Sequence, residues 1–241
     1  MILAVNIGNT NIRAAIGRHG KIESQAVVYA EEGLQQIETE LALNWNKVED
    51  SIIASVVPSK TEDIIKILEN KIQKPVRRIN IRSCGSLITN AYAKPLGEDR
   101  VVCCARALQK FSPPFAVIDY GTATTINIVN AHGEFIGGSI LVGLQTALDA
   151  LAKNTNQLPQ IHTANVSAIS IIGKNTVENL QSGAVFGLAC ATEGMINKMQ
   201  KELGCKLKIV VTGGHAPYIL PYCDFDYLHE PSLLLEGLLS I

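Results

Sequence analysis

The sequence Val5-Asn6-Ile7-Gly8-Asn9-Thr10 near the start of the chain returns in altered form as Ile118-Asp119-Tyr120-Gly121-Thr122 in its middle. Each copy follows an apolar segment and places an asparagine or aspartate two residues before a glycine. Four residue pairs share one offset of 113 (119 − 6): Asn6 and Asp119, Gly8 and Gly121, His19 and His132, Gly20 and Gly133. Because chance agreement at four positions is rare, the pattern indicates an internal duplication.

Each copy has the pattern of a β-hairpin with a tight turn. A glycine lets the backbone approach an anion closely, and neighbouring Asn and Thr side chains add donors suited to phosphate. The acidic or amide residue at the strand end can reach a metal ion or its water ligands. Two ordinary hairpins, in which these residues serve only the turn geometry, are the alternative. The matched pair favours two turns that grip a nucleoside triphosphate.

At 241 residues the chain can form one large domain or two of about 110–120 residues, and the duplication favours two. A hydrophobic content of 47% suffices for two cores. A proline pair ends an expected helix just before the second copy begins, so we predict domains at residues 1–113 and 114–241. Apolar strand patterns alternate with helical ones, which indicates the α/β class with a mixed sheet.

Charge and hydropathy exclude several classes of function. The formal net charge is −1 and there is no long basic run, so we expect no nucleic-acid partner. No stretch of the sequence reaches the ~18 apolar residues of a membrane helix, and Met1–Val5 is too short for a signal peptide. We therefore expect a cytoplasmic protein without a membrane partner, whose six cysteines are buried, reduced thiols.

A long helix is expected from about Thr176 to Leu203. Asn175 followed by Glu178 resembles a capping box, and Gly204 is suited to the helix end. Small residues fall on one stripe of this helix, which allows close packing against a partner helix.

The sequence Gly97-Glu98-Asp99-Arg100 lies at the start of another expected helix. Acidic residues in a first turn complement the positive end of the helix dipole, and that role alone would explain them. Alternatively, a carboxylate here accepts the proton of a substrate hydroxyl, beside an arginine that binds an anion.

These motifs together resemble the type III pantothenate kinase family. The chain carries Asn6-Ile-Gly-Asn-Thr, Gly97-Glu-Asp-Arg, Asp119-Tyr-Gly-Thr-Ala-Thr, Gly137-Gly-Ser-Ile and Gly173-Lys-Asn-Thr in the order of the family's motifs. The resemblance extends from Leu3 to Leu238. It implies an actin-like fold of two duplicated ribonuclease-H-like domains around a nucleotide cleft.

The resemblance also implies an activity, its cofactors and its site residues. The activity is ATP-dependent phosphorylation of pantothenate, the first step of coenzyme A synthesis, by a homodimer with Mg²⁺ and a monovalent cation, K⁺ or NH₄⁺. Asp99 would accept the proton of the pantothenate hydroxyl. The remaining implied contacts are pantothenate at Tyr92, Gly97, Glu98, Asp99, Arg100 and Thr176; ATP at Asn6, Ile7, Gly8, Asn9, Thr10, Asn11, Ile12, Arg13 and Thr122; and the monovalent cation at Asp119.

Two residues and one spacing depart from the family pattern. Asn6 replaces the aspartate of the first motif, and an amide lacks the negative charge that favours Mg²⁺. We therefore expect weaker Mg²⁺-dependent turnover than an aspartate at this position would give. Val142 replaces a proline, and the spacing from Tyr92 to Gly97 is shorter by about two residues than in the family that the chain resembles.

Two other functions are compatible with the same motifs. A non-catalytic regulator that binds nucleotide or pantothenate, like the Bvg accessory factors of this family, would tolerate Asn6. A phosphatase or another sugar kinase of the actin-like fold would share the phosphate-binding hairpins, but neither would account for Gly97-Glu98-Asp99-Arg100.

Overall fold

The computed structural model describes residues 1–241 except 32, 80–83, 85–95 and 167–168. The chain divides into two compact units. The first comprises Met1–Ser112, Gly133–Phe135 and Ser232–Ile241, and the second comprises Pro113–His132 and Ile136–Pro231.

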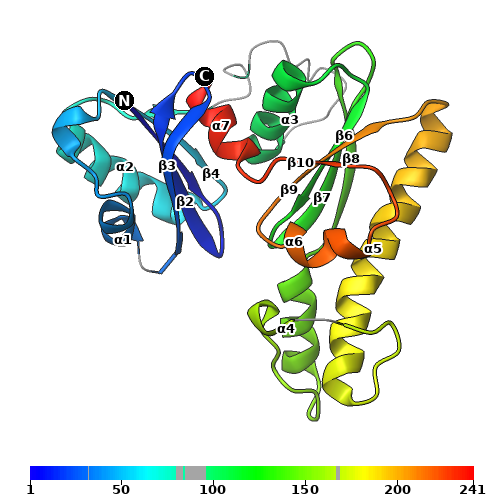
Figure 1. Ribbon diagram of the computed structural model, residues 1–241. Coiled ribbons are helices and arrows are strands. Elements are labelled where there is room, and N and C mark those ends of the chain that lie inside the picture. The colour runs from blue at the N-terminus through cyan, green and yellow to red at the C-terminus, as the bar shows by residue number, and fades with distance from the viewer. Residues whose placement is uncertain (32, 80–83, 85–95, 167–168) are drawn as a thin grey trace. The chain divides into compact units, whose positions relative to one another are not determined.

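The first unit contains a five-stranded mixed sheet with the order β3-β2-β1-β4-β5 (Figure 1). Its strands are β1 (Ile2–Ile7), β2 (Asn11–Arg18), β3 (Lys21–Tyr29), β4 (Asp50–Ser55) and β5 (Arg77–Arg78). The first three form antiparallel hairpins, whereas β4 pairs with β1 in parallel and β5 pairs with β4 in parallel.

The second unit repeats this topology, with the order β8-β7-β6-β9-β10. Its strands are β6 (Phe115–Tyr120), β7 (Ala123–Val129), β8 (Phe135–Val142), β9 (Lys208–Thr212) and β10 (Leu228–His229). β6 and β7 are antiparallel, and β9 is parallel to both β6 and β10. In both units, therefore, the first two strands form a hairpin, the third strand pairs beside the second, and the last two strands lie on the other side of the first, as the duplication predicts.

Helices lie between and beside the strands in each unit. Those of the first unit are α1 (Gly33–Glu40), the short 3₁₀ helix η1 (Trp45–Lys47), α2 (Pro58–Ile72), α3 (Glu98–Lys110) and α7 (Leu233–Leu239). Those of the second are α4 (Leu144–Asn154), η3 (Thr163–Asn165), α5 (Thr176–Leu203), α6 (Ala216–Ile219) and η4 (Leu220–Tyr222). None of the helices in these described ranges is long and apolar enough to cross a membrane.

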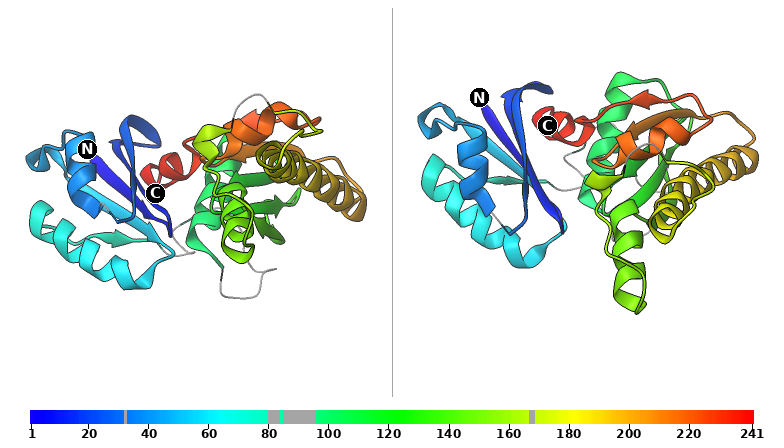
Figure 2. Two further views of the ribbon diagram at one scale, coloured as in Figure 1. Left: turned by 90° about the horizontal axis from the view of Figure 1, so that it is seen from below. Right: turned by 60° about the horizontal axis from the view of Figure 1, so that its bottom comes forward.

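The last helix, α7, belongs to the first unit although it ends the chain. It lies beside β1 and β2 in both views of Figure 2, and the Gly20 N–H donates to the carbonyl oxygen of Leu239 (3.0 Å). The predicted domain range 114–241 therefore differs from the contact-defined units in Gly133–Phe135 and in Ser232–Ile241. The leucines of the second segment are buried in the first unit. The predicted change of domain near Pro113 lies within one residue of the change of unit.

Each sheet has one face in an aliphatic core, because alternate residues of a strand point to the same side. Leu3, Val5 and Ile7 of β1 pack with Ile64 and Leu68 of α2. The second core contains residues of β6, β7, β9 and α5: Ala116, Ile118, Ile126, Val185, Ile196 and Val211. Burying this aliphatic surface is the main driving force for folding.

Several local predictions are confirmed. Asn175 caps α5 by accepting from the Glu178 N–H (3.0 Å), and the Asn175 amide donates back to the Glu178 side chain (2.8 Å). Gly204 ends α5 with a φ of 66°, in the left-handed region that favours glycine. All six cysteines are free thiols, but only Cys84, Cys103 and Cys104 are buried as predicted, whereas Cys223 is half-buried and Cys190 and Cys205 are exposed.

Candidate active site

The turn of the first hairpin joins β1 to β2. Asn6 is half-buried in β1, where it pairs with Arg13 of β2 and Ala54 of β4. The Gly8 N–H donates to the Asn11 carbonyl oxygen (2.9 Å), so this amide closes the turn. Asn9 and Thr10 are exposed at the tip. The side chains of this turn that are exposed are therefore those of Asn9 and Thr10, whereas the Gly8 amide and the Thr10 carbonyl oxygen are already used in backbone hydrogen bonds.

The second hairpin has a shorter turn than the first. Tyr120 pairs with Thr124 across β6 and β7, whereas the matching residue Ile7 pairs with Ile12, so three residues separate the pair instead of four. The Gly121 N–H donates to the Ala123 carbonyl oxygen (3.2 Å). The two copies thus share the strands and the glycine but differ by one residue in the turn.

Asp119 lies at the carboxyl end of β6, beside Thr212 at the end of the parallel strand β9. Its Oδ1 atom is buried. Gly213 follows β9 with a φ of 103°, and a Cβ at this position would lie 2.5 Å from Asp119 Oδ1 and 2.5 Å from Tyr120 N. Only a glycine allows the chain to pass this close to the carboxylate.

Three residues that sequence reasoning did not assign surround the second turn. The Thr146 hydroxyl donates to the Thr122 carbonyl oxygen (2.7 Å), and His215 Nδ1 lies 3.2 Å from the Gly121 carbonyl oxygen. A Cβ on Gly143 would lie 2.2 Å from the Thr122 carbonyl oxygen. Two features of the sequence could have pointed to these residues: Gly143 comes shortly after the Gly137-Gly138 motif, and His215 directly follows Gly213-Gly214.

Glu98, Asp99 and Arg100 form the first turn of α3, so the motif lies at a helix start as the sequence predicts. Asp99 Oδ1 accepts a hydrogen bond from the Arg100 N–H (2.8 Å). The Arg100 guanidinium lies 5.5 Å from the centre of the Phe135 ring, within the range of a cation–π contact. Glu98 and Asp99 therefore stabilise the start of α3 through the helix dipole, whether or not they also act on a substrate.

The Glu98 side chain lies against the end of β4. Burial raises the pKa of its carboxyl above the usual range, and a hydrogen bond from the Ser55 backbone and the charge of Arg78 partly offset this effect. Ser55 pairs with Ile7 at the carboxyl end of β1. The start of α3 and the end of β1 that carries Asn6 therefore lie at the same end of the first sheet, where open α/β sheets bind ligands.

The remaining predicted residues are outside these clusters. Thr176 is the exposed first residue of α5. Tyr92 lies outside the described residues. Within the part of the chain that the structure describes, no group of three or more His, Cys, Asp or Glu side chains is arranged to hold a metal ion.

Comparison with known proteins identifies the family. The family model for type III pantothenate kinase matches residues 2–198. A type III pantothenate kinase of Thermus thermophilus is 34% identical over 100% of this chain and 98% of its own length. That of Rhodococcus jostii is 33% identical over 99% of this chain and 93% of its own.

The fold also matches solved structures. The activator of 2-hydroxyisocaproyl-CoA dehydratase from Clostridium difficile, solved with bound ADPNP, superposes with a TM-score of 0.55 at 14% identity, over 99% of this chain and 91% of that one. Such a likeness concerns the fold alone, and it agrees with the predicted α/β class with two related domains. With the family model covering most of the chain and relatives aligned over its full length, this protein belongs to the type III pantothenate kinase family.

Proposed function

We propose that this protein transfers the γ-phosphoryl group of ATP to the hydroxyl group of pantothenate, the first step towards coenzyme A. The observation that carries the proposal is the family match over residues 2–198. It includes Asp99 and Arg100, which the structure fixes in the first turn of α3.

Asp99 is the proposed acceptor of the proton that leaves the pantothenate hydroxyl. The hydrogen bond from the Arg100 N–H to Asp99 Oδ1 holds the carboxylate in one orientation. Arg100 would bind the anionic substrate or the transferring phosphoryl group. Phosphoryl transfer depends mainly on positioning and charge stabilisation, which a carboxylate and a guanidinium on one helix turn can supply.

The residues proposed to bind ATP are Asn6–Arg13 in the first unit and Thr122 in the second. Asn9 and Thr10 are exposed at the first turn, and Thr122 is held through its carbonyl oxygen by the Thr146 hydroxyl. Held turns can bind phosphate without further ordering, which reduces the entropy lost on binding.

Mg²⁺ would be held by the phosphate oxygens and by one or two protein oxygens, its usual arrangement in kinases. Asn6, half-buried in β1, would offer one amide oxygen. When bound, Mg²⁺ neutralises charge on the phosphates. Asn6 contributes no charge of its own, so we propose that turnover is weaker than with aspartate.

Asp119 is the proposed ligand of K⁺ or NH₄⁺. Its carboxylate oxygen Oδ1 is buried, and Gly213 leaves room beside it that a Cβ would fill. Oxygen donors of this kind suit hard cations, so the residues fit the implied cation.

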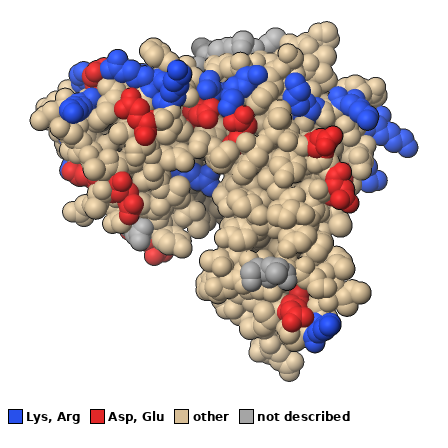
Figure 3. All heavy atoms as spheres, viewed as in Figure 1, with Lys and Arg blue, Asp and Glu red and all other residues tan. Residues whose placement is uncertain are grey.

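The protein is proposed to form a homodimer, with its interface at the surface around the start of α5. Large apolar side chains are exposed there: Ile171 (59%), Ile172 (75%) and Val177 (42%). Figure 3 shows few charged side chains on the viewed face of the part that carries α4 and the first half of α5. Gly183 and Gly187 leave open space along α5, where a Cβ would meet no atom within 4 Å. Thr176 lies within this surface, so its proposed contact with pantothenate depends on the dimer.

A coupled assay of ADP release tests the proposal. The purified chain is incubated with ATP, Mg²⁺ and K⁺, with and without pantothenate, and the product is identified by mass spectrometry. We expect ADP release that requires pantothenate and yields phosphopantothenate. ATP binding without any turnover would instead identify a regulator of the same fold. Cell fractionation tests the predicted cytoplasmic location.

A further inference from the structure

The carbonyl oxygens of the second hairpin turn are held by residues from other parts of the second unit. The Tyr120 carbonyl oxygen accepts from the His215 backbone N–H (2.9 Å), and that of Gly121 lies 3.2 Å from Nδ1 of the His215 ring. The next carbonyl oxygen, that of Thr122, accepts from the Thr146 hydroxyl (2.7 Å). Three successive carbonyl groups of the turn are therefore fixed in direction by residues that lie outside the hairpin.

Two of these oxygens converge on the start of α4. A Cβ on Gly143 would lie 2.2 Å from the Thr122 carbonyl oxygen and 2.5 Å from that of Gly121. Gly143 is the N-cap residue of α4, so the positive end of the helix dipole lies beside both oxygens. The partial negative charge of the turn is thus directed toward α4.

The N–H groups of the same peptide bonds point the opposite way. Both peptide bonds are trans, and the C=O and N–H of a planar trans peptide point in opposite directions. The Thr122 N–H therefore points away from the His215 ring, and the Ala123 N–H points away from the Thr146 hydroxyl. Thr122 and Ala123 are both exposed. Successive backbone N–H groups that point to one side form a concavity suited to an anion such as phosphate.

The contact with Gly121 determines which nitrogen of the His215 ring carries a proton. A carbonyl oxygen only accepts, so the proton must be on Nδ1. In a neutral histidine the hydrogen bonds of the ring select the tautomer. The half-buried His215 directly precedes α6, and its backbone N–H is bound to Tyr120. Backbone and ring of one residue therefore hold two successive carbonyl groups of the turn.

We propose that His215 is a positioning residue of the ATP site, whose Nδ1–H holds the Gly121 carbonyl oxygen toward the protein and so keeps the Thr122 N–H directed at a phosphate group. The Thr146 hydroxyl does the same for the Thr122 carbonyl oxygen and the Ala123 N–H. The inference rests on the proposed function, in which Thr122 contacts ATP. Without the ring, the peptide between Gly121 and Thr122 is free to rotate, and a carbonyl oxygen that turns outward repels a phosphate.

The test uses three replacements of His215 that differ in where they place a donor. Asparagine places its amide nitrogen near the position of Nδ1, glutamine places it near that of Nε2, and alanine has no side-chain donor. In His215→Ala and His215→Gln we expect the Kd of ATP, measured by calorimetric titration, and the KM for ATP to rise about tenfold, the loss expected for one hydrogen bond. In His215→Asn both should stay within about threefold of the wild type, because the donor is kept.

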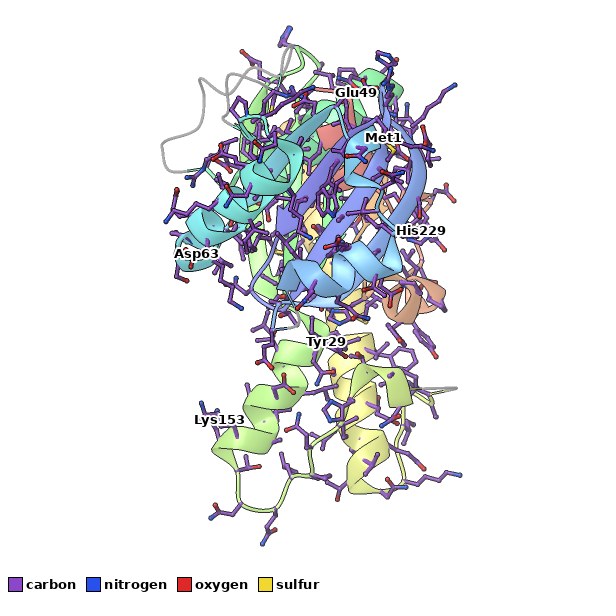
Figure 4. The ribbon with its side chains drawn as sticks, turned by 90° about the vertical axis from the view of Figure 1, so that its left-hand side faces the viewer. Met1, Tyr29, Glu49, Asp63, Lys153 and His229 are labelled. Carbon is purple, nitrogen blue, oxygen red and sulfur yellow. The ribbon has the colours of Figure 1, made fainter. Side chains whose placement is uncertain are left out.

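Two comparisons separate this role from a general loss of structure. The KM for pantothenate should be unchanged in all three variants, since the turn is assigned to ATP. His229→Ala is the control and should bind ATP like the wild type, because His229 is an exposed histidine in β10 of the same unit, labelled in Figure 4. Wild-type affinity for ATP in His215→Ala would overturn the inference, and so would equal losses in His215→Ala and His215→Asn.

A second readout needs neither ATP nor turnover. Long-range ¹H–¹⁵N spectra of the wild type at alkaline pH report the tautomer of each of the five histidines, and the signal that is missing in His215→Asn identifies His215. We expect its proton on Nδ1, whereas the exposed His229 should carry its proton mainly on Nε2, the tautomer favoured in water. An Nε2–H tautomer at His215 would overturn the inference.

Failure of the proposed function would give a different result. A wild type that binds ATP but shows no pantothenate-dependent turnover would refute the proposed function alone. The ATP titrations and the tautomer would still decide the role of His215.

Discussion

The replacement Gly143→Ala adds one methyl group beside the Gly121–Thr122 turn. Gly143 has a φ of −78°, which alanine adopts without strain, so the effect comes from contact alone. The added Cβ would lie 2.2 Å from the Thr122 carbonyl oxygen and 2.5 Å from that of Gly121. Real Cβ atoms essentially never approach below 3.0 Å, so the turn or the start of α4 must move by about 0.8 Å (3.0 − 2.2).

A displacement of this size has a predictable cost in binding and stability. Overpacking costs about 1–3 kcal/mol, which corresponds to a fall in Tm of roughly 2–12 °C for a chain of this size. Misplacement of a binding group by about 1 Å can cost about 100-fold in rate. We therefore expect kcat/KM for ATP to fall roughly 10–100-fold at a temperature where the variant is folded.

Steady-state kinetics with varied ATP and calorimetric titration with ATP measure this effect, with thermal unfolding alongside. Gly194→Ala is the matched control in α5, because a Cβ at Gly194 meets no atom within 4 Å. It should keep the activity and gain about 0.5–1 kcal/mol of helix stability. A folded Gly143→Ala variant that binds and uses ATP like the wild type would refute the assignment of the Thr122 turn to ATP.

Three further predictions follow from separate features. Asn6→Asp should raise Mg²⁺-dependent kcat about tenfold, because it supplies a carboxylate at the end of β1; unchanged turnover across a Mg²⁺ titration would contradict this. Glu236→Gln should lower the free energy of unfolding in urea by about 1–2 kcal/mol, because the half-buried Glu236 carboxylate accepts from Arg106 (3.1 Å) and Lys110 (3.2 Å). The control Glu62→Gln, at an exposed carboxylate, should lower it by less than about 0.5 kcal/mol. Val177→Asp should convert the dimer to a monomer in sedimentation experiments, because it buries a charge in the proposed interface; a dimer of unchanged stability would place the interface elsewhere.

The duplication was the part of the fold that the sequence revealed best. Apolar strand patterns and the Asn6 and Asp119 motifs recur at one offset, and the same strand order follows in both units. The one-residue difference between the two turns was not predicted, because the offset holds again at His19 and His132 on the far side of each hairpin. If the second copy lacks one residue in the turn and has one more residue later in the hairpin, the offset between the two histidines is unchanged, and the sequence comparison does not reveal the difference.

The place of α7 could not be predicted from its own residues. Leu233–Leu239 has leucines at every position except Glu236 and Gly237, so it has no clear periodic pattern that indicates which surface it covers. Its position depends on tertiary contacts, such as the Gly20–Leu239 hydrogen bond.

The candidate site shows the same division between local and long-range information. Motifs identified Asp99, Arg100 and Asp119, which carry charge. They did not identify Thr146 or His215, whose hydrogen bonds to the second turn become visible only when β6, α4 and the segment after β9 are brought together.

Pantothenate-dependent release of ADP by the wild type and by Asp99→Asn is the most direct test of the account. The prediction is turnover in the wild type only when pantothenate is present, and a loss of at least about 100-fold in Asp99→Asn with ATP binding retained. Equal turnover in the two proteins, or ADP release that does not require pantothenate, would contradict the assignment of Asp99 and of the substrate.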